Sequence, residues 1–203
     1  MEIDYQTFES ALKNWCELRY NEFKYYWPLN GGWEGWVQVD FAAYLQHNAP
    51  QVTLYREKKI YTDPKKRVDW LVNGDAPNPR KRIAVEIKCL SGGILNVKSP
   101  GTELKKFIAG IQKDQRKLKQ ENISMDNRGC QTVVIAINFA PEVQSSLEAA
   151  GLNCVTTAGD GEVQLWAQYI YTQMEVEPSF GASTSLGPFA PNPLSTSSSM
   201  FST

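Results

Sequence analysis

Apolar residues recur at helical spacing in several parts of the chain. They fall every three or four positions in residues 6–27, and a second broad apolar face covers residues 33–49. A third helical pattern covers residues 102–121, where lysine and arginine occupy much of the outer face. A proline opens the segment 141–150, as expected in the first turn of a helix. The pattern therefore predicts helices in these four segments.

Segments with extended patterns predict strands between and after these helices. The first is lysine-rich, as is typical of an edge strand, and the fourth begins with a continuously apolar run, as is typical of a central strand covered on both faces. Turn formers fill residues 74–79, which predicts an antiparallel hairpin between the second and third strands. We expect the last strand to close the sheet. The predicted strands cover residues 52–61, 67–73, 82–90, 132–139 and 163–171.

The order of these elements predicts an α/β domain with a mixed central β-sheet flanked by helices on both faces. We expect an N-terminal helical extension over residues 1–32 and the α/β core over residues 33–177. Residues 178–203 carry no charged side chain and are dominated by Ser, Thr, Pro, Gly and Ala. Such a segment lacks the apolar surface that folding requires, so we expect a disordered tail there.

The composition is typical of a globular protein, with 42% hydrophobic and 21% charged residues among 203. The N-terminus has no basic start followed by an apolar run, and no segment approaches the roughly 18 apolar residues of a membrane helix. The four cysteines are scattered without a CxxC pair, which favours reduced thiols over a disulfide framework or a zinc site. We therefore expect an intracellular protein, cytoplasmic or nuclear, without a signal peptide or transmembrane segment.

The net charge of −1 hides a strong asymmetry along the chain. Residues 1–55 carry three basic and seven acidic side chains, a balance of −4. Residues 56–119 carry seventeen basic and seven acidic side chains, a balance of +10, and residues 120–203 carry one against eight, a balance of −7. A basic segment of this size favours a polyanionic partner such as nucleic acid, although lysines on solvated strand edges would give the same count.

The candidate chemistry lies in the predicted hairpin. Alternation along residues 82–90 places Glu86 and Lys88 on the face opposite the apolar residues of that strand. Asp69, on the preceding strand, falls near Glu86 if the hairpin pairs about its turn. Two such carboxylates repel each other, and a divalent cation such as Mg²⁺ or Mn²⁺ removes that conflict. The alternative is a cross-strand salt bridge on a solvated sheet face.

This arrangement, Asp69 followed by Glu86-Ile87-Lys88, resembles the PD-(D/E)xK superfamily of restriction-endonuclease-like nucleases, with Val68 where a proline often stands. The resemblance implies a restriction-endonuclease-like core and hydrolysis of phosphodiester bonds that depends on Mg²⁺ or Mn²⁺. It implies that Asp69 and Glu86 bind the metal, with the main-chain carbonyl of Ile87 as a further ligand. Lys88 would then position the attacking water and offset charge in the transition state.

The resemblance also implies site residues on two helices. Many members carry a metal-binding glutamate on the first core helix, and Glu34 is the best candidate, although an acid there also complements the helix dipole. Gln38, one turn later, is a weaker candidate for substrate contact. On the helix at 102–121, Gln115 interrupts the apolar stripe; we expect it to face the chemistry, although a core residue bonded to backbone would look the same. The substrate-binding candidates there are Lys113, Gln115 and Lys117, and Gln112 and Asp114 are other possibilities.

The sequence therefore predicts a metal-dependent nuclease that acts on DNA or RNA. The alternative is a catalytically inactive nucleic-acid-binding or protein-interaction module on the same fold. Asp69, Glu86 and Lys88 favour the enzyme, because a pure binder has no need of clustered carboxylates that face a polyanion. The sequence leaves open DNA or RNA, single or double strands, endonuclease or exonuclease action, and the oligomeric state.

Overall fold

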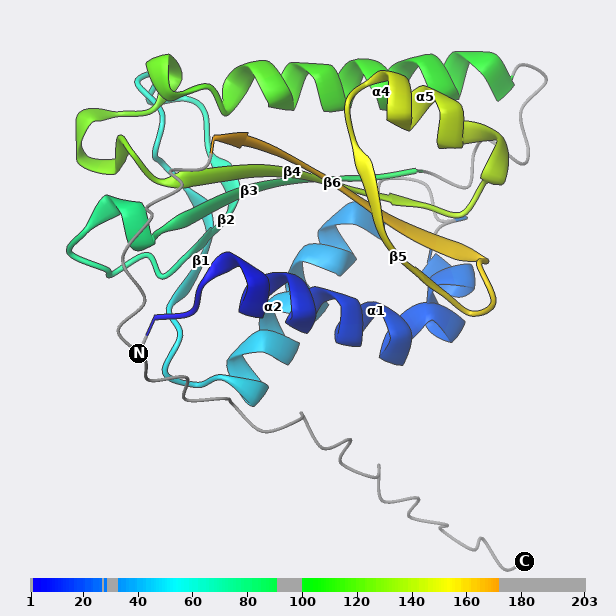
Figure 1. Cartoon of the computed structure of the whole chain (residues 1–203), viewed down its shortest axis with the longest axis horizontal. Coiled ribbons are helices and arrows are strands. Elements are labelled where there is room, and N and C mark those ends of the chain that lie inside the picture. The colour runs from blue at the N-terminus through cyan, green and yellow to red at the C-terminus, as the bar shows by residue number, and fades with distance from the viewer. Residues whose placement is uncertain (1, 27, 29–32, 91–99, 172–203) are drawn as a thin grey trace, which may run out of the picture.

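The computed structural model describes residues 2–26, 28, 33–90 and 100–171, and it shows a mixed α/β fold (Figure 1). The predicted tail at 178–203 lies outside the described residues. All four cysteines carry free thiols, which confirms the expectation of no disulfide framework. Among the described helices, none has an apolar stretch long enough to cross a membrane.

A six-stranded mixed sheet forms the centre of the molecule, with the strand order β1-β2-β3-β4-β6-β5. β3 and β4 pair in parallel, and the other neighbouring strands of this sheet pair antiparallel. The parallel pair lies at the centre, where both faces are covered. The strands are β1 (Leu54–Lys58), β2 (Val68–Val72), β3 (Ile83–Cys89), β4 (Gln131–Asn138), β5 (Asn153–Ala158) and β6 (Val163–Tyr171).

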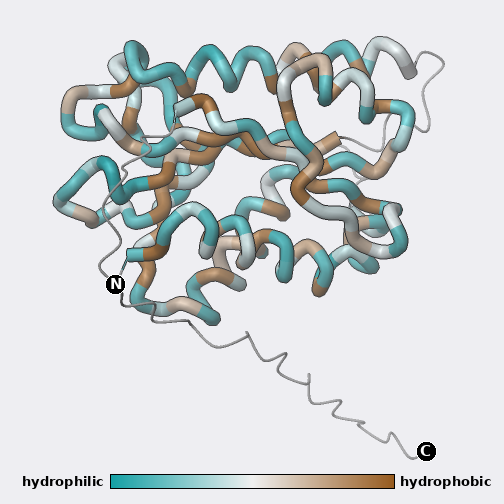
Figure 2. Tube along the Cα trace, viewed as in Figure 1, coloured by the Kyte–Doolittle hydropathy of each residue, from teal (hydrophilic) through white to brown (hydrophobic). Residues whose placement is uncertain are grey.

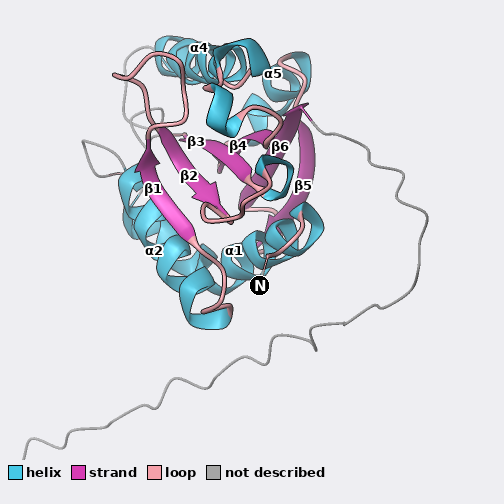
Figure 3. Ribbon diagram, turned by 90° about the vertical axis from the view of Figure 1, so that its left-hand side faces the viewer, coloured by secondary structure: helices cyan, strands magenta, loops and turns pink. Residues whose placement is uncertain are grey.

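Helices cover both faces of this twisted sheet. α1 and α2 lie on one face, whereas α4 and α5 lie on the other (Figures 1 and 3). The α-helices are α1 (Tyr5–Tyr26), α2 (Trp33–Asn48), α4 (Pro100–Lys117) and α5 (Gln144–Ala149). Short 3-10 turns cover Pro79–Lys81 (η1), Gln120–Asn122 (η2), Met125–Asn127 (η3) and Pro141–Val143 (η4).

The predicted elements are largely confirmed, with two corrections. The third predicted helix ends at Lys117 rather than near residue 121, and a separate 3-10 turn follows it. Strand β5 was not predicted, and it, rather than β6, forms the sheet edge. Its residues are mostly polar and half-exposed, and its pairing with β6 shifts register between Cys154 and Thr156. Only Ala158 of this strand is buried, so no alternation of apolar and polar residues marks it in the sequence.

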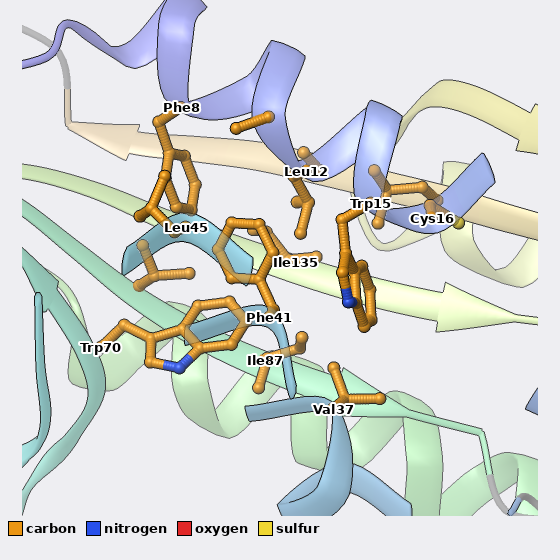
Figure 4. Close-up of a cluster of buried hydrophobic side chains, with 14 of the residues drawn as sticks. Phe8, Leu12, Trp15, Cys16, Val37, Phe41, Leu45, Trp70, Ile87 and Ile135 are labelled. Carbon is orange, nitrogen blue, oxygen red and sulfur yellow. The ribbon is translucent and has the colours of Figure 1, made fainter. Parts of the chain in front are cut away.

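Alternation along the strands divides the buried residues into two cores. The face of α1 and α2 is rich in aromatic rings, including Phe8, Trp15, Phe41 and Trp70, which pack against Ile87 of β3 (Figure 4). Hydrophobic residues follow the strands through the centre of the molecule, whereas much of α4 is hydrophilic (Figure 2). Because α1 and α2 share this core, both helices depend on the sheet for their stability.

The helix α4 connects the two parallel strands and lies across β3 and β4. Its apolar side chains, including Phe107 and Ile111, pack into the second core together with Leu118, which follows the helix, and Ala84 of β3. The even-numbered residues of β3 face this helix, whereas the odd-numbered residues face α1 and α2. This arrangement decides which side chains can reach the polar positions of β3.

Candidate functional site

The antiparallel pairing of β2 with β3 brings the two hairpin acids together. The register Trp70↔Val85, continued by one residue, sets Asp69 opposite Glu86 on the face of α4, as the sequence predicts. The Ile87 backbone N–H donates to Asp69 Oδ2 at 2.8 Å. Asp69 is 9% exposed and Glu86 only 1%, so this pair is not a salt bridge on a solvated face.

Glu34 reaches the cluster from the N-terminus of α2. The indole of Trp33 donates to the carbonyl of Leu90 at 2.7 Å, which fixes the start of this helix beside the end of β3. Glu34 Oε2 accepts from the Cys89 backbone N–H at 3.3 Å, and Glu34 Oε1 lies 3.1 Å from Lys88 Nζ. The helix thus contributes the acid that the sequence predicts at this end of the strand.

Two residues of α4 complete the cluster from above the sheet. Asp114 Oδ2 lies 3.2 Å from Lys88 Nζ, and Lys117 Nζ lies 2.6 Å from Glu86 Oε1. Residues three apart on a helix share a face, so one turn of α4 supplies both partners. The helix runs opposite to β3, and each charge on the strand therefore meets its opposite on the helix.

Tyr61 is a member of the cluster that the sequence analysis did not identify. Its hydroxyl donates to Glu86 Oε1, and Lys117 Nζ lies 5.0 Å from its ring centroid. A short bridge between Tyr61 and Ile123 holds it in place, flanked by backbone hydrogen bonds. This contact joins segments about 60 residues apart in sequence, so no local pattern could predict it.

Asp114 occupies an apolar position in the helix pattern, although the sequence pattern had assigned the inward-facing polar position to its neighbour Gln115. The buried positions of α4 are Phe107, Ile111 and Asp114, and Leu118 directly after the helix continues this spacing, in which Asp114 takes an apolar position. Gln115 lies to one side of this stripe, where it donates to the carbonyl of Ala150 at 2.7 Å and to Gln168 Oε1 at 2.6 Å. The expectation that Gln115 faces the chemistry is therefore wrong.

The other candidates lie apart from the carboxylates in the described contacts. Gln38 is buried against the first strands, where its side chain accepts from Arg56 at 3.1 Å and its carbonyl accepts from the Trp70 indole at 3.1 Å. Lys113 is exposed on α4. The structure thus brings together Asp69, Glu86, Lys88, Glu34 and Lys117, but not Gln38, Lys113 or Gln115.

Burial dominates the electrostatics of Glu86. It raises the pKa of this carboxyl to about 8, and the negative charges of Asp69 and Asp114 act in the same direction. Lys117 opposes both effects through its charge and its hydrogen bond. Glu86 thus retains a proton to an unusually high pH unless a further positive charge stabilises its anion.

Lys88 is shared between two acids. Burial alone would lower the pKa of its ammonium, but Glu34, Asp114 and Asp69 together raise it. Burial raises the pKa of Glu34, and Lys88 opposes that shift; the same holds for Asp114. The side chains of Lys88 and Glu34 are 26% and 29% exposed, so the cluster opens to solvent at this end.

Negative charge is in excess in this cluster. It contains four carboxylates but two ammonium groups, so full ionisation leaves two negative charges uncompensated in a largely buried environment. Protonation of Glu86 is one way to reduce this excess. A divalent cation is another, and its charge equals the excess. The members are Asp69, Glu86, Glu34 and Asp114 on one side and Lys88 and Lys117 on the other.

The donor atoms suit such a cation, but their present arrangement does not cage one. Carboxylate and carbonyl oxygens are the hard ligands that Mg²⁺ and Mn²⁺ prefer. Within the described residues, no three acidic, histidine or cysteine side chains are placed to hold one ion. Instead the ammonium of Lys88 lies 3.0 to 3.2 Å from Ile87 O, Glu34 Oε1 and Asp114 Oδ2. A cation that binds here must displace a lysine from some of these oxygens.

Known proteins offer no guide to the role of this cluster. Comparisons of the chain with protein-family models, with curated proteins and with solved structures found no match.

Proposed function

We propose that this chain is a metal-dependent nuclease that hydrolyses phosphodiester bonds of DNA or RNA, with a restriction-endonuclease-like core of the PD-(D/E)xK type. One observation carries the proposal: Asp69, Glu86, Lys88 and Glu34 converge at one end of a mixed sheet with negative charge in excess. The strand-borne Asp and the E-x-K triplet meet across a hairpin, which is the arrangement that the resemblance implies.

A purely structural role explains only half of the cluster. Two ion pairs, Glu86 with Lys117 and Lys88 with Asp114, would suffice to fasten α4 to the sheet. Asp69 and Glu34 add two further carboxylates that this fastening does not need. Buried charge in excess of its partners destabilises a fold. Retention of both acids is therefore better explained by chemistry than by packing.

The residues divide into metal ligands and a water-positioning group. Asp69, Glu86, Glu34 and the carbonyl of Ile87 would hold Mg²⁺ or Mn²⁺, which when bound supplies Lewis-acid stabilisation of the phosphate and lowers the pKa of a coordinated water. Lys88, through its ammonium, positions the attacking water and offsets the negative charge of the transition state.

Basic side chains near the cluster favour a polyanionic substrate. The +10 balance of residues 56–119 lies on the segment that contributes most of the cluster. The exposed Lys59, Lys65, Lys66 and Arg67 lie between Tyr61 and Asp69 or next to them, so they are close to the site in sequence and available to phosphates. Lys113 and Lys117 remain the proposed substrate contacts on α4, and Gln38 remains a weaker proposal.

The test is a cleavage assay on single- and double-stranded DNA and RNA with Mg²⁺ or Mn²⁺. Asp69→Asn keeps an acceptor for the Ile87 N–H but removes a ligand charge, so we expect kcat to fall by about 100-fold or more. Asp75→Asn is the matched control, because Asp75 is an exposed acid in the same hairpin. Absence of cleavage of all four substrates with both metals would exclude the enzyme.

One observation favours the alternative of an inactive binding module. Lys88 and Lys117 already occupy carboxylates that a metal would need. Such a module would bind nucleic acid or a protein partner without cleavage, and Asp69→Asn would leave its affinity unchanged or improved. A gel-shift assay beside the cleavage assay separates the two functions.

A further inference from the structure

The ammonium of Lys88 has three oxygen neighbours, of which two belong to proposed metal ligands and one does not. Two of them, Glu34 Oε1 at 3.1 Å and Ile87 O at 3.0 Å, are atoms that would bind the metal in the proposed function. The third is Asp114 Oδ2 at 3.2 Å. If a cation takes the first two oxygens, Lys88 loses both of those partners at once. The oxygen of Asp114 is then its remaining described partner.

Asp114 forms its described ion pair with Lys88. It is 5% exposed and occupies an apolar-stripe position of α4, where a carboxylate without a partner would strongly destabilise the fold. Its Oδ2 lies within ion-pair distance of Lys88 but lacks an aligned hydrogen bond in the described structure. The acid therefore has unused capacity to accept a hydrogen bond.

The path of the Lys88 side chain supports the same pairing. Gly110 lies one turn before Asp114 on the same face of α4, and a Cβ at Gly110 would lie 3.4 Å from Lys88 Cδ. A side chain larger than alanine at residue 110 would push this stem away. The lack of a side chain at Gly110 thus leaves room beside the helix for the aliphatic part of Lys88. The ammonium of Lys88 then lies next to the carboxylate of Asp114.

We propose that Asp114 is a positioning residue, which retains Lys88 beside the reacting water when a cation binds Glu34 and the Ile87 carbonyl. Lys88 would then have two acidic partners with different roles. Glu34 would bind the metal in place of the lysine, and Asp114 would keep its ion pair with the lysine. This inference rests on the proposed function. It assigns Asp114 a role distinct from that of a metal ligand.

The kinetic test compares Asp114→Asn with Glu34→Gln and with the control Glu103→Gln, an acid in the first turn of the same helix that pairs with Lys106. Asp114→Asn should lower kcat by about 10- to 100-fold, because Lys88 loses its orientation, with KM and Mn²⁺ affinity unchanged. Glu34→Gln should weaken Mn²⁺ binding in calorimetry, and Glu103→Gln should change neither. An unchanged kcat in Asp114→Asn, or a fall matched by loss of Mn²⁺ affinity, overturns the assignment.

A measurement on the unmodified chain keeps the proposal testable if Asp114→Asn does not fold. NMR spectroscopy during a Mg²⁺ titration follows the carboxyl carbons of Glu34 and Asp114 and the ammonium protons of Lys88. We expect the Glu34 signal to shift strongly and the Asp114 signal to shift less, while the Lys88 ammonium remains protected from exchange. Loss of that protection, or a shift of Asp114 equal to that of Glu34, overturns the positioning role. No shift in any cluster carboxyl overturns the proposed metal-dependent function itself.

Discussion

The two faces of the sheet are built from the same strands but hold very different interiors. On the face of α1 and α2, the rings of Phe41 and Trp70 lie 4.9 Å apart and those of Trp15 and Phe41 lie 5.5 Å apart. On the face of α4, β3 presents Glu86 instead, in contact with further charged groups. Neighbouring residues of one strand thus either pack into the aromatic core or join the charged cluster, according to the side that they face.

This difference has an energetic meaning. Each large side chain buried on the aromatic face contributes on the order of 1.5–3 kcal/mol of hydrophobic stabilisation. Each carboxylate buried on the opposite face carries a desolvation cost that its partners offset only in part. The aromatic face therefore stabilises a fold whose other face holds the candidate site.

The largest expected effect is on the aromatic face. Phe41→Ala removes a ring that packs against Phe8, Trp15 and Trp70, so we expect the free energy of unfolding to fall by about 3–5 kcal/mol. Denaturant titration measures this loss. Val39→Ala, an exposed position on the same helix, should change it by less than about 0.5 kcal/mol. A loss below about 1 kcal/mol for Phe41→Ala would contradict the division between the faces.

The next effect concerns the charged face and its dependence on pH. The folded chain raises the pKa of Glu86 from 4.5 to about 8, so the folded state binds more protons than the unfolded state between these values. The contribution of this group to stability is therefore highest at low pH and falls as the pH rises through this range, by at most about 1.4 kcal/mol per unit. The charged and titratable groups that face Glu86 are Asp69, Asp114, Lys117 and Tyr61.

Replacement of Glu86 isolates the part of the pH dependence of stability that comes from this residue. Glu86→Gln cannot ionise, so the free energy of unfolding should depend less on pH between 5 and 8 than in the unmodified chain. Glu121→Gln, an exposed control, should keep the original slope. Urea titrations across this pH range provide the measurement, and equal slopes for all three proteins would refute the raised pKa.

The smallest of these effects tests the residue that links the site to the loop after β1. Tyr61→Phe removes the hydroxyl that donates to Glu86, and an intramolecular hydrogen bond contributes about 0.5–1.5 kcal/mol, so stability should fall within that range. Tyr55→Phe removes a hydroxyl bonded to Asp75 at an exposed position and should cost less. Thermal unfolding of both variants measures the two losses of stability. Equal losses would mean that burial of the Glu86 contact has no energetic consequence.

Much of the fold could be predicted, because its signals are local. Apolar periodicity depends on residues a few positions apart, so the helices, the central strand β4 and the hairpin were found within a few residues of their ends. The pairing of Asp69 with Glu86 followed from the hairpin, whose two strands are close in sequence. The edge strand β5 was not predicted, because its residues are mostly exposed or half-buried and show no apolar alternation.

The parts of the site that could not be predicted depend on long-range contacts. Gln115 and Asp114 are adjacent on α4, so their side chains point about 100° apart around the helix axis, and the rotation of the helix decides which of them faces β3. A sequence pattern defines the apolar stripe only to about one residue, whereas the side-chain packing of Phe107 and Ile111 sets the rotation.

The sequence by itself determined that a strand carrying Glu86 and Lys88 follows a strand carrying Asp69, because alternation and turn chemistry act over short distances. Only the tertiary structure decided that Tyr61 and α4 close over these residues. That decision rests on the sheet order and on the packing of α4 across parallel strands, which join residues far apart in the chain. The physical reason is burial: one sheet face excludes water only after the helix is in place, and the charges acquire their partners at that step.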